Sequence, residues 1–404
     1  MPELAAAQNR ALSPSHPRAL PVFLAFLAMG FGDAAGPFVG LARQQFSLSN
    51  FAAQMIALTG FIMFGVLSVP MGVYQDKKGK KLVLLLGLAI MLAGVLIPTI
   101  FGLAAFPVLL LTVLMLGAGA AVLQVAGNPL VRDVSEEGNY SRNLSLAQFV
   151  KAIGSLSGPL IPVIAAQFFG LTWRVVFPVF TVAIAITLLA GTTLNVRPAP
   201  AASRQTATLG SCLALLKNGY VAMMVLAIFL YVGAEVSLSS GIPLYLKDHF
   251  GVDIARIGLL GTGLFFAALT IGRFSGGVVL SWIKPKPFFV GTCLFSIVGL
   301  AGLFLPSERL AVVGFFLAGL GFANIFPLVF SITVDALPDE ANALSGLMVT
   351  AIVGGAFLPV IMGKITDVTH SWHAGFLVPL GAILYVTWTA VANLRGTHRT
   401  ASLA

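Results

Sequence analysis

Long apolar runs, separated from one another by short polar segments, dominate the chain. A membrane-spanning helix needs roughly 20 apolar residues, because each residue rises ~1.5 Å and the hydrocarbon core is ~30 Å thick. The runs are continuously apolar and lack the alternation of a membrane β-strand, so they predict helices. By this measure the sequence predicts twelve spans, near residues 20–41, 51–74, 82–103, 106–128, 143–169, 172–194, 215–243, 255–279, 287–305, 309–331, 342–368 and 372–394.

A polar stretch after the sixth run divides the chain into two halves. Similar residues recur about 200 positions apart, as internal repeats do; the pairs Gly117/Gly119 and Gly319/Gly321 are one example. Such duplication is typical of two six-helix bundles related by an axis along the membrane normal, which can rock about a central site. The predicted divisions are a disordered cytoplasmic N-terminus (1–18), a first bundle (19–194), a cytoplasmic linker (195–214), a second bundle (215–395) and a cytoplasmic tail (396–404).

Composition and charge narrow the class of protein further. Apolar residues make up 58% of the 404 residues and charged residues only 9%, against about 25% in soluble domains. This composition excludes a water-soluble enzyme, and the sequence shows no metal-binding, nucleotide-binding or catalytic motif. The net charge of +9 does not indicate nucleic-acid binding, because Lys and Arg lie in short loops. If the N-terminus is cytoplasmic, fifteen of these Lys and Arg residues fall in cytoplasmic segments and five in outer loops, and this bias predicts that both termini are cytoplasmic. The five in outer loops are Arg43, Arg174, Lys247, Arg256 and Arg309.

The loop between the second and third runs combines glycines, an acid and several bases. Residues 72–81 read GVYQDKKGKK, which resembles the G-x-x-x-D-R-x-G-R-R signature of the major facilitator superfamily. Gly72 permits close helix contact, Gly79 permits a tight turn, and Asp76 can pair with cations or cap a helix end. The resemblance implies that Gly72, Asp76, Gly79 and Lys80 form a conformational latch between the bundles. A plain basic turn is the alternative, but it would explain only the lysines.

Three ionisable residues stand out deep inside predicted spans: Asp33, Lys151 and Glu235. A charge is costly there and therefore indicates function. Counted from the cytoplasmic side, Asp33 lies ~20 Å deep and Lys151 ~12 Å deep at the helical rise. A lysine side chain covers this difference, so an ion pair between the two is geometrically possible. The alternative is a permanent pair that only neutralises both charges, although buried pairs rarely stabilise more than apolar substitutes.

Uncharged hydrogen-bonding residues accompany these charges. Gln124 and Asn128 lie in the fourth run, and Gln148 lies in the fifth. An amide both donates and accepts hydrogen bonds, which matches the hydroxyl groups of a sugar. The alternative is hydrogen bonding between helices. For Asn128, which precedes Pro129 near a helix end, this alternative is favoured.

Several segments in both halves resemble the fucose–galactose–glucose branch of the major facilitator superfamily. This resemblance implies secondary uptake of hexoses driven by a proton or sodium gradient. Asp33 matches the membrane aspartate that takes part in proton coupling in the fucose member, and Gln124 matches a glutamate or glutamine position. The chain departs from the branch in lacking asparagines just before Asp33 and in carrying Lys151 where asparagine is common. The matching segments are 123–129 (LQVAGNP), 146–148 (LAQ), 231–236 (YVGAEV), 272–274 (GRF) and 351–355 (AIVGG).

Together these features predict a major facilitator fold and a hexose:cation symporter that works by alternating access. We expect Asp33 to be the coupling site, tuned by Lys151, and the substrate contacts to be Gln124, Asn128, Gln148 and Glu235. No cofactor is expected beyond the coupling ion, H⁺ or Na⁺. We expect a monomer in the cell (inner) membrane whose partners are a small sugar and lipid, not nucleic acid. Two alternatives stay open: a sugar facilitator in which Lys151 replaces the coupling cation, and a drug/proton antiporter.

Overall fold

The computed structural model describes residues 20–33, 35–133, 140–194, 209–252, 259–305 and 307–395. Every regular element in these ranges is a helix. The two predicted tails and most of the predicted linker lie outside them. Twelve of the described helical stretches are long and apolar enough to cross a membrane, and each overlaps one predicted span. The prediction of an all-α protein with twelve membrane helices is therefore confirmed.

The first half supplies six of these spans. Its first span consists of two helices on either side of residue 34 and continues to Phe46, beyond the predicted end at residue 41. The helices are α2 (Leu20–Asp33), α3 (Ala35–Phe46), α4 (Asn50–Lys78), α5 (Lys80–Phe101), α6 (Phe106–Asp133), α7 (Tyr140–Phe169), the 3₁₀ turn η2 (Trp173–Val175) and α8 (Val176–Thr192).

The second half supplies the other six spans, preceded by a short helix within the predicted linker, α9 (Leu209–Ala214). The spans predicted near 309–331 and 342–368 each consist of two helices. The elements after α9 are η4 (Leu215–Lys217), α10 (Gly219–Phe250), α11 (Leu259–Val279), α12 (Pro285–Ala301), η6 (Gly302–Phe304), α13 (Glu308–Phe322), α14 (Ile325–Ala336), η7 (Pro338–Glu340), α15 (Ala341–Thr350), η8 (Ala351–Val353), α16 (Gly354–Thr369) and α17 (Trp372–Arg395).

Helix α10 corrects one predicted boundary. The sequence prediction ended this span at Pro243, but the helix continues to Phe250. A proline lacks the N–H that would bond to the carbonyl four residues earlier, here Ser239. The hydroxyl of Thr262 on α11 donates to that carbonyl instead, at 3.4 Å. A neighbouring helix thus supplies the missing donor, as is common in membrane helices that contain proline.

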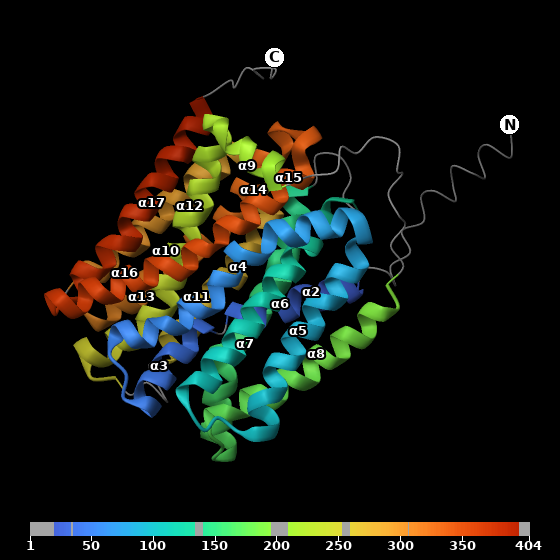
Figure 1. The fold of residues 1–404 in the computed structure, drawn as a ribbon. Coiled ribbons are helices and arrows are strands. Elements are labelled where there is room, and N and C mark those ends of the chain that lie inside the picture. The colour runs from blue at the N-terminus through green and yellow to red at the C-terminus, as the bar shows by residue number, and fades with distance from the viewer. Residues whose placement is uncertain are drawn as a thin grey trace, which may run out of the picture.

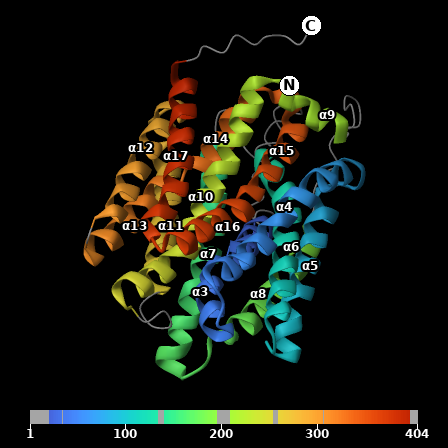
Figure 2. The same ribbon diagram turned by 60° about the vertical axis from the view of Figure 1, so that its left-hand side comes forward.

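The two halves lie side by side, as Figures 1 and 2 show from two directions. Helices α2 to α8 form one group and α10 to α17 form the other. The groups meet where α7 packs against α11 and α14, α4 against α15 and α16, and α3 against α10. The chain therefore has an interface between two helical groups that runs along the length of the spans.

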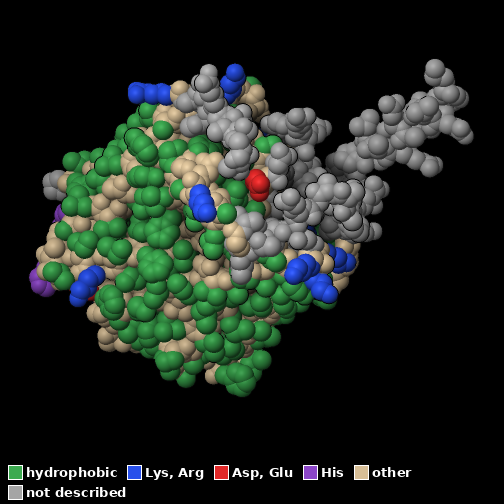
Figure 3. Space-filling model, turned by 45° about the horizontal axis from the view of Figure 1, so that its top comes forward, with side chains coloured by type: hydrophobic (Ala, Val, Ile, Leu, Met, Phe, Trp, Pro, Cys, Tyr) green, Lys and Arg blue, Asp and Glu red, His purple; other side chains and the backbone are tan. Residues whose placement is uncertain are grey.

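The outer surface of the molecule is apolar. Hydrophobic side chains cover most of the described surface visible in Figure 3, and Lys and Arg appear only in small, separate groups. Large exposed side chains include Phe101, Leu189 and Trp282, which are 80%, 68% and 79% exposed. Such a surface is unstable in water and suits contact with lipid. The membrane prediction and the structure therefore agree.

Candidate functional site

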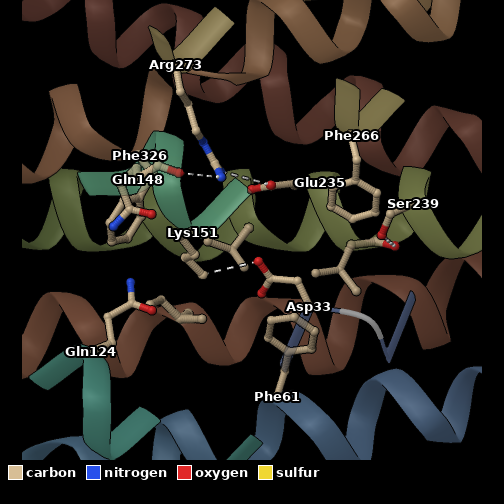
Figure 4. A pocket seen from close by; sticks show the side chains of 13 residues that line it. Asp33, Phe61, Gln124, Gln148, Lys151, Glu235, Ser239, Phe266, Arg273 and Phe326 are labelled. Carbon is tan, nitrogen blue, oxygen red and sulfur yellow. Dashed lines mark hydrogen bonds and ion pairs between the residues drawn. The ribbon is translucent and has the colours of Figure 1, made fainter. Parts of the chain in front are cut away.

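A small cavity lies between the two halves, and Figure 4 shows the side chains that line it. Its volume of about 30 Å³ is far below the roughly 300–1,000 Å³ of a typical ligand pocket. A ligand of sugar size therefore requires the halves to move apart. The polar and aromatic lining residues are Asp33, Phe61, Gln124, Gln148 and Lys151 from the first half and Glu235, Ser239, Phe266, Arg273 and Phe326 from the second.

Asp33 and Lys151 form an ion pair in this cavity. The Nζ of Lys151 lies 3.4 Å from Oδ2 of Asp33, and the two side chains are only 12% and 17% exposed. The hydroxyl of Ser155, one turn further along α7, donates a 2.7 Å hydrogen bond to the same Oδ2. The pair that helical rise made geometrically possible is thus present, and it connects α2 with α7 (Figure 4).

Two glycines bring the backbones of α2 and α7 close enough for this pair. A Cβ on Gly30 would collide with the backbone oxygen of Lys151. A Cβ on Gly154 would collide with the backbone oxygen of Leu27. Small residues let membrane helices approach closely, and here the approach fixes the distance between the charged side chains. Gly30, three residues before Asp33, therefore has a packing role.

Arg273 and Glu235 form a second ion pair beside the first. The Nη2 of Arg273 lies 3.3 Å from Oε1 of Glu235, and the side chains are 4% and 15% exposed. The guanidinium also donates to the backbone oxygens of Ala323, at 3.3 Å, and Gln148, at 3.4 Å. Because Gln148 belongs to the first half and the other partners to the second, Arg273 joins the two halves at the cavity.

Sequence reasoning missed Arg273, although the residue lies within the predicted span 255–279. The argument from the cost of a membrane charge, which singled out Glu235, applies equally to an arginine in the middle of an apolar run. In the sequence, the GRF segment that contains Arg273 supports only the family resemblance. The signal was therefore present in the sequence.

Two predicted substrate amides reach the cavity with unsatisfied polar atoms. Oε1 of Gln124 and Nε2 of Gln148 are buried and have no hydrogen-bond partner among the described residues. An unpaired buried polar group costs about 1–3 kcal/mol, so these atoms favour a ligand that can pair with them. One is an acceptor and the other a donor. A ligand with hydroxyl groups can satisfy both.

Asn128 lies apart from this group. It is fully buried but does not line the cavity, and within the described part of the chain both its Oδ1 and Nδ2 atoms lack a partner. It lies four positions after Gln124 on the same helix, which is ~6 Å along the axis. The structure therefore brings together Asp33, Gln124, Gln148, Lys151 and Glu235, and it does not add Asn128 to them.

Contacts join the two halves on both sides of the cavity. On the predicted outer side, Arg43 pairs with Asp248 at 3.2 Å. On the predicted cytoplasmic side, the hydroxyl of Ser141 on α7 donates to the hydroxyl of Ser331 on α14 at 2.7 Å. A ligand can enter or leave only if one of these sets of contacts opens.

The residues of the predicted latch lie where α4 meets α5. Gly79 ends α4 with a φ of 88°, a conformation that other residues rarely adopt, and Lys80 begins α5. Gly72 faces Gly346 on α15 of the other half. The side chain of Asp76 lies outside the described part of the structure, so its predicted latch role stays a prediction.

The sequence and the fold match a known family. The model of the Major Facilitator Superfamily matches residues 22–358 and, in a second alignment, 224–402. The glucose/galactose transporter of Brucella abortus is 24% identical over 362 residues, 86% of each chain. The L-fucose-proton symporter of Escherichia coli is 22% identical over 373 residues, 83% of this chain and 84% of that one. Proteins named for nitrite and nitrate transport also match.

The fold resembles a solved transporter structure. The crystal structure of the Major Facilitator Superfamily transporter FucP, in the outward conformation, aligns with 93% of this chain and 98% of its own chain. The TM-score is 0.74 and the sequence identity is 20%. At this identity the likeness concerns the fold, so the arrangement of two helical halves is shared.

Proposed function

This chain belongs to the Major Facilitator Superfamily and is a multi-pass membrane transporter, and we propose that it carries a monosaccharide by cation symport. The proposed substrate is a hexose or a close derivative of one. The proposed coupling ion is a proton, bound at Asp33. The observation that carries the proposal is the Asp33–Lys151 ion pair, which stands beside two unpartnered amides in a cavity between the halves.

The unpartnered amides support a polyhydroxylated substrate. A sugar hydroxyl can donate to Oε1 of Gln124, and another can accept from Nε2 of Gln148. Apolar faces for the C–H side of a sugar ring are available on Phe61, Phe266 and Phe326. Relatives named for glucose, galactose and fucose transport support the same class.

The surroundings of Asp33 favour a proton over Na⁺ as the coupling ion. Oδ2 of Asp33 faces the ammonium of Lys151 at 3.4 Å. A Na⁺ ion on this carboxylate would stand next to a fixed positive charge, which repels it. Protonation removes the negative charge without adding a second ion, and it releases Lys151 from the pair. In this proposal the change in contacts between α2 and α7 is what links proton binding to the movement of the halves.

Uptake into proteoliposomes tests this proposal. Labelled hexoses and hexose derivatives are offered under an imposed proton gradient, sodium gradient or neither. We expect accumulation only with the proton gradient. Asp33→Asn should abolish accumulation and spare counterflow exchange, which needs no net proton movement. The exposed Glu308→Gln change on the predicted outer side serves as the control. Undiminished accumulation by the Asp33→Asn protein would remove Asp33 from the coupling mechanism.

A facilitator is the second candidate, and one observation favours it. The positive charges of Lys151 and Arg273 already balance the negative charges of Asp33 and Glu235. Lys151 would then permanently occupy the place of a coupling cation, and transport would run only down the substrate gradient. Collapsing the proton gradient with an uncoupler separates the candidates. Initial uptake by a facilitator should not change, whereas uptake by a proton symporter should fall to the level without a gradient.

A further inference from the structure

The charges of the four ionisable side chains known to line the cavity sum to zero. Asp33 and Glu235 are the carboxylates, and Lys151 and Arg273 are the cations. Each carboxylate has a cation within 3.4 Å. Among the described residues, the charged groups that line the cavity with Asp33 are Lys151 from α7, Glu235 from α10 and Arg273 from α11. In the closed arrangement, this part of the protein therefore carries no net charge.

A proton on Asp33 would disturb this balance. The cavity would hold one uncompensated positive charge on Lys151, in a space with room for little water. Burying an unpaired ion is strongly unfavourable, and so is removing one member of a buried pair. The balance returns if the substrate itself brings one negative charge. Resting on the proposed function, we propose that the substrate is a sugar acid whose carboxylate binds Lys151 when Asp33 is protonated.

The geometry selects Lys151 rather than Arg273 as the partner of this carboxylate. The Nε, Nη1 and Nη2 groups of Arg273 are held by the Ala323 oxygen, the Gln148 oxygen and Glu235. These contacts use three of the five guanidinium N–H groups, and Glu235 already compensates the positive charge, so a substrate carboxylate would have to compete with Glu235 for it. Lys151 loses its ionic partner as soon as Asp33 takes a proton. The substrate carboxylate then replaces Asp33 as the ionic partner of Lys151, so both the ammonium and the carboxylate are paired.

The unpartnered amides distinguish a sugar acid from a simple carboxylic acid. Gln124 and Gln148 offer an acceptor and a donor that a substrate such as acetate cannot use. A hexuronate has both a carboxylate for Lys151 and hydroxyls for the amides. The transported unit, one proton with one sugar-acid anion, is electrically neutral. Its transport should therefore not depend on the membrane potential.

Uptake by the wild-type protein under separate control of pH and potential tests this inference. Proteoliposomes with an acidic exterior receive labelled glucuronate, galacturonate, glucose, galactose, fucose or acetate. Potassium and valinomycin set the potential to zero or to negative inside. We expect uptake of a hexuronate at least tenfold above that of the neutral sugars and acetate, and less than twofold faster at the negative potential. A neutral sugar carried with a proton would be accelerated by that potential.

The substitution Lys151→Asn adds a second measurement. Removing a charged hydrogen-bond partner should lower hexuronate uptake about tenfold to hundredfold, and hexuronate uptake should fall more steeply than the uptake of neutral sugars. Lys151→Arg should retain part of the hexuronate uptake, because the charge is kept. Lys364→Asn, which removes an exposed lysine on α16 outside the cavity, is the matched control and should behave as wild type.

The outcomes separate this inference from the proposed function. Proton-driven, Asp33-dependent uptake of a neutral hexose with no uptake of hexuronates would overturn the sugar-acid inference and leave the proposed function standing. Uptake of acetate alone, or of none of the sugars, would contradict the proposed function itself. Equal loss of neutral and acidic sugar uptake in Lys151→Asn would also overturn the inference, because the lysine would then act only on the structure.

Discussion

The carboxylate of Asp367, near the end of α16, accepts a 2.7 Å hydrogen bond from the side-chain amide of Asn50. Its second oxygen accepts a 3.0 Å bond from the backbone N–H of Phe51. These donors lie in the first turn of α4, where backbone N–H groups have no partner within the helix. A carboxylate of the second half therefore caps a helix of the first half, on the predicted outer side of the cavity.

Replacing Asp367 by asparagine should weaken this closure. The new amide could still accept from Asn50 with its oxygen, but its NH₂ group would face the N–H of Phe51, donor against donor. The lost charge also removes the favourable interaction with the start of α4. We expect about a tenfold to hundredfold shift toward an outward-open arrangement, in line with the 1.5–3 kcal/mol of a charged hydrogen bond.

Spin labels on the outer ends of α4 and α16 would measure this shift as a longer distance population. Glu308→Gln removes another acid on the predicted outer side and serves as the control. A distance distribution identical to that of wild type would show that the Asp367 contacts do not hold the halves together.

The Arg43–Asp248 pair should make a smaller contribution to the same closure. Its side chains are 24% and 28% exposed, and exposed pairs contribute about 0–1 kcal/mol. Reversing one charge, by Arg43→Asp or Asp248→Arg, should reduce transport severalfold. The double reversal should restore it only in part, because the indole N–H of Trp372 also donates to Asp248, at 3.3 Å. Initial uptake rates of the wild type, the two single variants and the double variant test this prediction. A double variant whose rate is no higher than that of the slower single variant would contradict it.

The fold could be predicted from the sequence because lipid imposes a simple rule. A helix that spans the membrane must satisfy its own backbone and present apolar side chains over its length, so each span leaves a visible run. The boundary at Pro243 could not be predicted in this way. Its helix continues because Thr262, on a different helix, supplies a donor to Ser239.

Part of the site could also be predicted from the sequence. The depths estimated from helical rise leave Asp33 within reach of the Lys151 side chain, and the structure pairs the two residues. In contrast, the contact between Asn50 and Asp367 joins residues 317 positions apart. The pattern of a single run does not tell which faces of two distant helices meet, so this contact required the three-dimensional structure.

The close approach of α2 to α7 predicts that glycine-to-alanine substitutions change stability in opposite directions at different positions. Gly30→Ala or Gly154→Ala would place a methyl group against the backbone of the facing helix. Such overpacking typically costs about 1–3 kcal/mol, so the thermal unfolding temperature should fall and the Asp33–Lys151 pair should separate. Gly291→Ala on α12 meets nothing within 4 Å and should be neutral or stabilising, because alanine favours helix by about 1 kcal/mol.

Thermal unfolding in detergent and proton-driven uptake would be measured on the three proteins. Gly30→Ala and Gly154→Ala should lose both stability and uptake, and Gly291→Ala should lose neither. Full uptake by Gly30→Ala would show that the close approach of the two helices is not needed for coupling.

The second ion pair predicts a strongly non-additive result. Arg273→Gln leaves Glu235 buried without its cation, which typically costs about 3–5 kcal/mol. Glu235→Gln should cost less, because Arg273 keeps its bonds to the Ala323 and Gln148 oxygens. In the double variant neither side chain is charged, and the loss of stability should be smaller than that of Arg273→Gln alone. Thermal unfolding of the four proteins measures this coupling. Losses that simply add would show that the two side chains do not compensate each other, and the charge balance argued for the cavity would then fail.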